Sequence, residues 1–293
     1  MDMIFGVPLP LLLGQLVLGL INGATYAILS LGLAVIFGML KVINFAHGAQ
    51  YMLGAFVAWM MASWLGLGFW YALILAPLVV GAGGIVLERV FLRHLYDKDH
   101  LFGLLFTFGF ALVAEGLFRY HFGSTGQIYS NPIPGGMQLG FMFLPYYRIF
   151  IVGIALLICF GTWFVIERTK LGAYLRAATE DPVLVRAFGI NVPLLITLTY
   201  GFGVALAALA GVIAAPIQNV SPLMGSHIII TVFAVVVIGG LNSIMGAIIT
   251  GFALGLIEGL AKVFIPEMSN TVVFVIMAIV LLLRPAGLFG QEQ

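Results

Sequence analysis

Hydrophobic residues lie along this chain in long runs, and the runs do not alternate in polarity. Runs near twenty residues long recur along the chain, and such a run is enough for a helix to cross a hydrocarbon core of about 30 Å. Only helices and closed barrels satisfy every backbone group in lipid, and the strands of a barrel would alternate. The pattern therefore predicts an all-α fold, a polytopic transmembrane bundle of about 8–10 spans. The predicted spans cover residues 10–39, 46–64, 70–88, 101–120, 148–166, 194–214, 228–242, 246–264 and 271–283.

The first span and the last three differ from a simple membrane helix. The first is long enough to be tilted, or to break at Asn22-Gly23. The last three are short or interrupted by glycine, so one of them could be re-entrant. Gly251, Gly255 and Gly259 form two consecutive G-x-x-x-G steps, which let a neighbouring backbone approach closely. Packing within this chain is favoured over a contact between two chains.

Positive residues set the expected orientation of the spans, because they gather on the cytoplasmic side. One threading places the N-terminus outside, the C-terminus inside and nine positive residues in the cytoplasm: Lys41, Arg89, Arg93, Lys98, Arg168, Lys170, Arg176, Arg186 and Arg284. The segment at about 121–147 then lies outside. It has no Lys, Arg, Asp or Glu and is rich in Gly, Pro, Ser and Asn, so it is predicted to be an ordered external loop.

A charged segment from Glu167 to Val192 separates two spans and has a helical pattern of its own. On a first short helix, one face carries Leu171, Tyr174, Leu175 and Ala178, spaced i, i+3, i+4 and i+7. A second short helix is predicted to follow, with Asp181 as N-cap, Pro182 at its first position, an apolar stripe of Leu184, Ala187 and Phe188, and Gly189 as a left-handed C-cap. A capped, charged helix pair suits docking of another protein at the membrane surface. A solvated loop that only maintains the topology fits these local features equally well.

Composition narrows the class of protein further. Hydrophobic residues make up 62% of the chain and charged residues 8%, and the mean hydropathy is +1.18, values that do not suit a water-soluble domain. The formal net charge of +1 gives no reason to expect nucleic acid as a partner. Cys159 is the single cysteine and has no partner for an internal disulfide. Residues 1–10 lack the positive region of a cleaved signal peptide, so the first span is expected to be retained.

Catalytic motifs are missing from the sequence. There is no cysteine pair, no H-E-x-x-H and no G-x-S-x-G, which argues against a membrane-embedded enzyme or metal centre. No lysine follows a glycine, so the chain has no Walker A motif and cannot hydrolyse ATP with a P-loop. We therefore expect neither catalytic residues nor a cofactor or metal.

Two acid–base pairs lie within the predicted spans, where a charge is costly. Glu115 and Arg119 are spaced i, i+4, as are Glu258 and Lys262, so each pair can neutralise itself on one helix face. A proton or sodium relay more often leaves an unpaired carboxylate near mid-membrane. A structural role is therefore favoured for both pairs.

Two polar clusters interrupt the apolar segments, at residues 44–51 and 218–227. Each combines hydrogen-bonding side chains with Gly or Pro, which can break a helix. Broken helices at membrane depth are tolerated where they line a cavity, and they often frame transport sites. The alternative is ordinary loop and cap chemistry at a membrane face. The residues that we expect to line or gate a pathway are Asn22, Tyr26, Asn44 and His47.

Several segments carry a resemblance to one known family. The most specific is Ile43-Asn44-Phe45-Ala46-His47-Gly48 followed by Met52-Leu53-Gly54-Ala55, within residues 22–56. Others are Glu180-Asp181-Pro182, Gly189-Ile190-Asn191, the run GGLNSIMGA at 239–247 and the ending LRPAGLF at 283–289. Together they resemble the permease subunits of branched-chain amino acid ABC importers, over nearly the whole chain. The chain resembles the LivH-type subunit of this family more than its longer partner permease.

That resemblance implies a single permease domain, residues 1–293, in the bacterial inner membrane, with a periplasmic N-terminus and a cytoplasmic C-terminus. It implies a four-part importer: a heterodimer with a second permease subunit, two cytoplasmic ATPase subunits that supply the ATP hydrolysis, and a periplasmic binding protein that delivers leucine, isoleucine or valine. The subunit itself would not be an enzyme. The segment at about 167–193 would be the coupling loop, docking on the ATPase through Arg176, Glu180, Asp181, Arg186 and Gly189.

Other functions remain open at this stage. Permeases of the same family for urea, short amides or other amino acids would share these motifs. An ion-coupled secondary transporter would need a coupling carboxylate in a span, and a sensor adaptor would need a soluble domain, which the sequence does not suggest.

Overall fold

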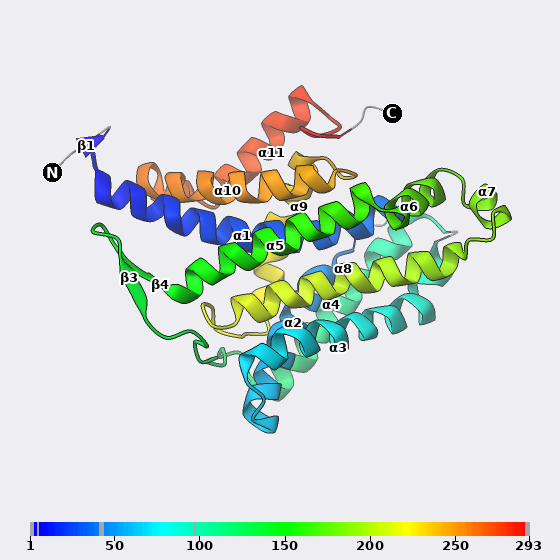
Figure 1. Ribbon diagram of the computed structural model, residues 1–293, viewed down its shortest axis with the longest axis horizontal. Coiled ribbons are helices and arrows are strands. Elements are labelled where there is room, and N and C mark those ends of the chain that lie inside the picture. The colour runs from blue at the N-terminus through cyan, green and yellow to red at the C-terminus, as the bar shows by residue number, and fades with distance from the viewer. Residues whose placement is uncertain (1–2, 5, 41–43, 97, 291–293) are drawn as a thin grey trace. The chain divides into compact units, whose positions relative to one another are not determined.

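The computed structural model describes residues 3–4, 6–40, 44–96 and 98–290, and this part of the chain is mostly helical (Figure 1). Its elements are β1 Met3–Ile4, β2 Val7–Pro8, α1 Leu9–Leu40, α2 Ala46–Leu65, α3 Phe69–Val90, the 3-10 helix η1 Leu92–Leu95, α4 His100–Phe122, β3 Gly136–Gln138, β4 Phe143–Pro145, α5 Tyr146–Arg168, α6 Lys170–Glu180, α7 Pro182–Ala187, α8 Val192–Ala214, α9 Met224–Gly239, α10 Ile244–Phe264, the 3-10 helix η2 Pro266–Met268 and α11 Val272–Leu283. The predicted all-α class is confirmed.

Every predicted span overlaps a helix, although α9 begins and ends earlier than the span predicted at 228–242. Among the described residues, six helices are long and apolar enough to cross a membrane: α1, α3, α4, α5, α8 and α10. The apolar helices α9 and α11 are shorter, with 16 and 12 residues. Twelve residues rise only about 18 Å, less than the hydrocarbon core of about 30 Å. The short helices therefore lie in the region where the sequence left room for a re-entrant segment.

Helix α1 is continuous through Asn22-Gly23, so the predicted alternative of a break there is wrong. Its 32 residues rise about 48 Å, well over the thickness of the hydrocarbon core. A helix of this length has to tilt or extend beyond the hydrocarbon. The other sequence alternative, tilting, is thus the one compatible with the structure.

Contacts within the chain group into two compact units. Unit one comprises Met1–Ser30, Asn131–Cys159 and Thr231–Gln293, and unit two comprises Leu31–Ser130 and Phe160–Ile230. Helices α1, α5 and α9 each contribute residues to both units.

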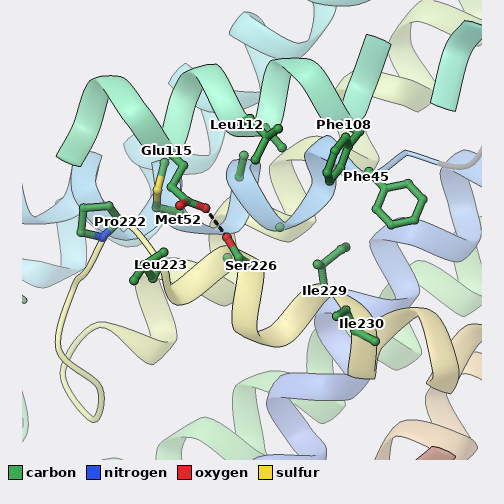
Figure 2. Close-up of a pocket in the computed structure, with 14 residues that line it drawn as sticks. Phe45, Met52, Phe108, Leu112, Glu115, Pro222, Leu223, Ser226, Ile229 and Ile230 are labelled. Atoms are coloured by element: carbon green, nitrogen blue, oxygen red, sulfur yellow. Dashed lines mark hydrogen bonds between the residues drawn. The ribbon is translucent and has the colours of Figure 1, made fainter. Parts of the chain in front are cut away.

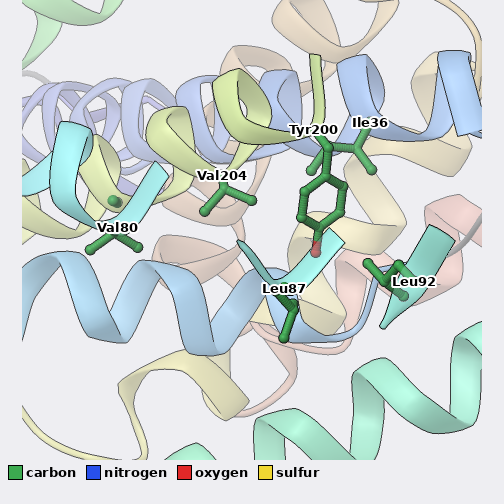
Figure 3. Packing of buried hydrophobic residues seen from close by; sticks show 7 residues of the cluster. Ile36, Val80, Leu87, Leu92, Tyr200 and Val204 are labelled. Carbon is green, nitrogen blue, oxygen red and sulfur yellow. The ribbon is translucent and has the colours of Figure 1, made fainter. Parts of the chain in front are cut away.

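Unit two is built on the packing of α2 and α3 against α8. Small residues bring the backbones together: a Cβ at Gly54 would meet the backbone of Ala208, and one at Gly81 would lie 3.1 Å from the Gly201 oxygen. Apolar side chains fill the space beside these contacts (Figure 3), in a cluster of Ile36, Val80, Leu87, Leu92, Tyr200, Val204 and Ala208. Lipid tails are as apolar as these side chains, so close van der Waals packing has to hold the helices together.

Unit one depends on the contact between α1 and α10. A Cβ at Gly19 would lie 2.5 Å from the Gly255 oxygen, and one at Gly251 would lie 2.7 Å from the Ala27 Cα. Gly259 faces Gln15 one turn further along. The G-x-x-x-G face therefore packs within this chain, as predicted from the sequence.

The segment between α4 and α5 has regular structure. In unit one, β3 and β4 form an antiparallel pair with Met137 opposite Leu144. In unit two, Gln127 and Val220 exchange two backbone hydrogen bonds of 2.8 and 3.0 Å. The loop at about 121–147 is ordered, as predicted. Its external position stays a prediction.

We expect Gly255→Ala to lower the thermal unfolding midpoint, because the added Cβ would overlap the α1 backbone at Gly23. Overpacking of this kind costs about 1–3 kcal/mol. The matched control is Gly153→Ala in α5, where nothing lies within 4 Å of an added Cβ. There, alanine should be neutral or stabilise the protein by up to about 1 kcal/mol. Equal midpoints for the two purified variants would contradict the packing role.

Candidate functional site

The two polar clusters predicted from the sequence meet in unit two. Helix α2 begins at Ala46 and α9 begins at Met224, and their first turns touch through glycine. A Cβ at Gly48 would lie 2.6 Å from the Gly225 oxygen, so any side chain there would force the helices apart. Near this contact, the Tyr51 hydroxyl donates to Gln218 Oε1 at 3.4 Å. Residues more than 160 positions apart in the sequence thus form one polar neighbourhood.

The start of α2 lies beside the interior of α4 rather than beside its end. The Phe45 amide donates to Thr107 Oγ1 at 3.2 Å, and Thr107 is fully buried. Thr107 is seven residues into α4, which corresponds to a rise of about 10 Å. Helix α2 therefore begins at depth within the bundle, the arrangement that the sequence suggested for a cavity-lining break.

A cavity of about 380 Å³ lies where α2, α4 and α9 meet. Figure 2 shows its side chains converging from these three helices and from the turn that precedes α9. The lining residues are Phe45, Gly48, Ala49, Met52, Phe108, Ala111, Leu112, Glu115, Pro222, Leu223, Gly225, Ser226, Ile229 and Ile230. Within this lining, only Glu115 and Ser226 carry polar side chains. A mostly apolar cavity with a few polar groups is typical of a small-molecule site.

Glu115 is the charged group of the cavity. Its Oε1 accepts from Arg119 Nη2 at 2.6 Å, which confirms the predicted i, i+4 pair. Its Oε2 accepts a hydrogen bond from the Ser226 hydroxyl of α9 (Figure 2). The sequence predicted the ion pair but not the position of Glu115 in the cavity, because the contact with Ser226 is made between helices.

A buried hydrogen-bonded network anchors the start of α2 to α8. Asn44 Nδ2 donates to Gln50 Oε1 and to the Tyr200 hydroxyl, both at 3.3 Å, and Gln50 Nε2 donates to the same hydroxyl at 3.2 Å. All three side chains are almost completely buried. Asn44 therefore contributes to the position of α2, and it does not line the cavity.

The remaining three predicted pathway residues lie in different places. His47 is fully buried and directly precedes Gly48 of the cavity lining. Tyr26 belongs to unit one, where its hydroxyl donates to Glu258 Oε2 at 2.7 Å. Glu258 also forms the predicted pair with Lys262, at 2.5 Å. Asn22 is half-buried on α1, also in unit one.

Glu88 is a buried carboxylate that the sequence reading missed. It is 1% exposed and accepts from Thr197 Oγ1 at 2.7 Å and from the Tyr96 hydroxyl at 3.0 Å. Partial burial and the neighbouring Glu88 raise the pKa of Tyr96, so this hydroxyl stays a donor. The available signal was a lone Glu in the last turn of the apolar span at 70–88, just before Arg89. Its partners come from α8 and from the residue after η1, which the sequence could not place beside it.

The predicted helix pair of the charged segment is confirmed as α6 and α7. Asp181 caps α7, because its Oδ1 accepts from the amides of Val183 and Leu184 at 3.0 and 2.9 Å. Pro182 occupies the first helical position. Gly189 follows the helix with φ of 80°, the left-handed conformation expected of a C-cap.

The buried residues of α6 and α7 differ from the apolar stripes predicted from the sequence. Of the first predicted stripe, Leu175 and Ala178 are buried, whereas Leu171 and Tyr174 are largely exposed. On α7 the buried residue is Val185, which packs in a small cluster with Ala178 and Val192. The predicted second stripe of Leu184, Ala187 and Phe188 is exposed, because α7 packs inward through Val185 instead.

The five predicted coupling residues divide by role. Arg176 donates to the Ile166 carbonyl at 2.9 Å and pairs with Glu167 at 3.4 Å, so it ties α6 to the end of α5. Asp181 and Gly189 define the ends of α7. Glu180 and Arg186 are exposed on the surface. They lie beside an apolar surface of Val183, Leu184 and Phe188, which are 74, 54 and 77% exposed.

Two of the family-like segments lie together in unit one. The amides of Leu288 and Phe289 donate to the carbonyls of Ile238 and Gly239, at 2.8 and 3.2 Å. Gly287 and Gly240 have φ of 84° and 100°. A Cβ added to Gly287 would lie 2.6 Å from the Gly240 Cα, so the two backbones are in close contact. The backbone contact explains why glycine is needed at both positions.

Comparison with known proteins extends these observations. The sequence pattern of the family described as branched-chain amino acid transport system, permease component, matches residues 15–281. The chain is 32% identical over 296 residues to the high-affinity branched-chain amino acid transport system permease protein BraD of Pseudomonas aeruginosa, with 96% of each chain covered. It is 29% identical to the corresponding permease LivH of Escherichia coli K12, also over 96% of each chain.

Two further comparisons concern a longer permease and a solved structure. The chain is 30% identical to the permease LivM of Escherichia coli K12, covering 92% of this chain and 68% of LivM. The better match in length to LivH agrees with the expected subunit type. A solved chain of PsaBC from Streptococcus pneumoniae in complex with Fab is 15% identical, with a TM-score of 0.44 over 93% of this chain and 88% of that chain.

We expect Tyr200→Phe to destabilise the protein by about 1 kcal/mol, because it leaves the buried amides of Asn44 and Gln50 without their shared acceptor. The measurement is the thermal unfolding midpoint of the purified protein in detergent. Tyr71→Phe is the matched control, since Tyr71 is 63% exposed. The network would have no anchoring role if both variants unfolded at the wild-type temperature.

Proposed function

The chain belongs to the family of branched-chain amino acid transport system permease components, and we propose on that basis that it is the translocating subunit of an ATP-driven ABC importer. Its substrates are leucine, isoleucine and valine. The observation that carries the proposal is the cavity formed where α2 and α9 begin beside the interior of α4. A largely apolar cavity at this depth suits a solute with an aliphatic side chain, and a broken helix is a common frame for a transport site.

The energy for transport comes from separate subunits in this proposal. The sequence has no Walker A motif, so ATP hydrolysis belongs to two ATPase subunits at the cytoplasmic face. A second permease subunit completes the pathway as a heterodimer, and a periplasmic protein delivers the amino acid. Specificity can then reside in the delivering protein, so the permease does not need a tight site.

Helix α7 is the proposed contact with the ATPase. It is short and capped at both ends, and Val185 packs it against Ala178 and Val192, so it presents its exposed residues in a defined orientation. Leu184 and Phe188 would enter an apolar groove, as amphipathic helices do in many complexes. Glu180 and Arg186 would form the polar rim of that contact.

The proposed orientation follows the positive residues. The N-terminus is periplasmic, the C-terminus is cytoplasmic, and α6 and α7 face the cytoplasm with Arg168, Lys170 and Arg186. The uncharged segment at about 121–147 then faces the periplasm and the delivering protein. The membrane is the bacterial inner membrane.

Asn22, Tyr26, Asn44 and His47 remain our proposed pathway or gate residues. The structure supports them unequally, because His47 adjoins the cavity lining, whereas Asn44 and Tyr26 hold other polar side chains in place. Leucine uptake that survives alanine at all four positions would remove this part of the proposal.

Reconstitution tests the function directly. The chain is assembled with its partner permease and ATPase subunits in proteoliposomes, and uptake of radiolabelled L-leucine is followed with the binding protein outside. We expect uptake only with ATP inside the liposomes. Uptake of urea or a short amide instead of leucine would favour the alternative substrates of this family. Leucine uptake driven by an ion gradient without ATP would mean a secondary transporter.

We expect Leu184→Ser combined with Phe188→Ser to lower co-purification of the ATPase by about tenfold or more, because two exposed apolar side chains are removed from the contact. Asp181 is left unchanged because it caps α7. The control pair is Tyr120→Ser with Ile128→Ser, which are 84 and 83% exposed and belong to the proposed periplasmic side. Normal ATPase recovery with the α7 variant would contradict docking there.

A further inference from the structure

The cavity between α2, α4 and α9 combines apolar walls with a single carboxylate, and this combination points to the chemistry of its ligand. We propose that it binds a free amino acid as a zwitterion. The ammonium group contacts the Glu115 carboxylate, and the aliphatic side chain packs against the apolar lining. The inference rests on the proposed function, because it assigns the substrate contacts of that transport site.

Glu115 is prepared to accept a cation from the cavity. One of its oxygens is paired with Arg119 at 2.6 Å, and the other accepts from the neutral Ser226 hydroxyl (Figure 2). An ammonium group can replace that hydroxyl and form a stronger, charge-assisted bond. While the site is empty, Arg119 compensates the charge, so no isolated carboxylate is left among apolar side chains.

The start of α9 provides hydrogen-bond donors and a partial positive charge for the carboxylate group of the ligand. Gly225 and Ser226 line the cavity from the first turn of α9. Amides in the first turn of a helix have no acceptor within it, and this end of the helix carries a partial positive charge. Once the ammonium group displaces the Ser226 hydroxyl from Glu115, that hydroxyl can donate to the carboxylate group of the ligand. The cavity thus offers a negative group on α4 and a positive helix end on α9.

The rest of the lining selects for an aliphatic side chain. Phe108 and Leu112 of α4 face Ile229 and Ile230 of α9, with Met52 of α2 between the helices (Figure 2). An uncharged polar solute such as an amide would lose its hydration against these walls without a strong partner in return. The geometry therefore favours an amino acid over urea or a short amide.

Ligand-dependent thermal stabilisation tests the site without the delivering protein. The importer assembled from this chain and its partner subunits is heated with L-leucine, with 4-methylpentanoate, which keeps the side chain and carboxylate but lacks the ammonium group, or with acetamide. We expect L-leucine alone to raise the unfolding midpoint, by about 2–4 °C at several times its Kd. Glu115→Gln should remove this shift.

A second variant keeps the test decisive if Glu115→Gln fails to assemble. Leu112→Trp narrows the cavity without changing its charge and should also abolish the leucine shift. The matched control is Val113→Trp at the next position, which is 61% exposed and outside the lining, and which should keep the shift. A full leucine shift in Glu115→Gln or Leu112→Trp, an equal shift with 4-methylpentanoate, or no shift in the wild type would overturn the site.

Uptake separates this inference from the proposed function. If the wild-type importer takes up L-leucine with ATP but fails the stabilisation test, the substrate contacts lie elsewhere and the function stands. If it does not take up any branched-chain amino acid, the proposed function itself is wrong, whatever leucine does to the unfolding midpoint.

Discussion

Close backbone contact between small residues is the constraint on which the rest of this structure depends. Helices in lipid gain no hydrophobic free energy from leaving the lipid for one another, so they associate through packing that small residues permit. The contact of α1 with α10 through Gly19, Gly23 and Gly255 serves unit one, and the contact of α2 with α8 at Gly54 serves unit two. The Gly48–Gly225 contact uses the same device at the site, where it holds two helix starts together and bounds the cavity beside them.

Polar groups at membrane depth are costly unless they are hydrogen-bonded, and several buried ones here share partners. Asn44 and Gln50 share the Tyr200 hydroxyl, and Glu88 accepts from Thr197 and Tyr96. The bonds that join Asn44 and Gln50 to Tyr200 supply partners at the start of α2, which lies inside the bundle beside the cavity. The buried network is therefore structural, and the polar groups available to a solute are the two on the surface of the cavity, Glu115 and Ser226.

The proposed coupling surface is exposed, so neither helix packing nor buried hydrogen bonds determine it. Local rules determine it: an Asp cap, a proline at the first position and a glycine with positive φ define a six-residue helix. One inward residue, Val185, packs that helix against Ala178 of α6 and Val192 of α8. Arg176 in turn ties α6 to the end of α5. Its remaining apolar residues have no partner within the described chain, which suits a contact with another subunit.

The sequence by itself determined the helices, the ordered loop between α4 and α5, both ion pairs and the caps of α7, because spans, i, i+4 pairs and caps depend on residues close together in the chain. Its family motifs also predicted the permease class. Tertiary structure alone decided that Glu115 faces Ser226, that Asn44 is an anchor, that Glu88 is bonded to Thr197 and that Leu184 and Phe188 point outward. Each of these depends on which helices pack together and through which face, and a pattern along one helix does not specify its neighbour.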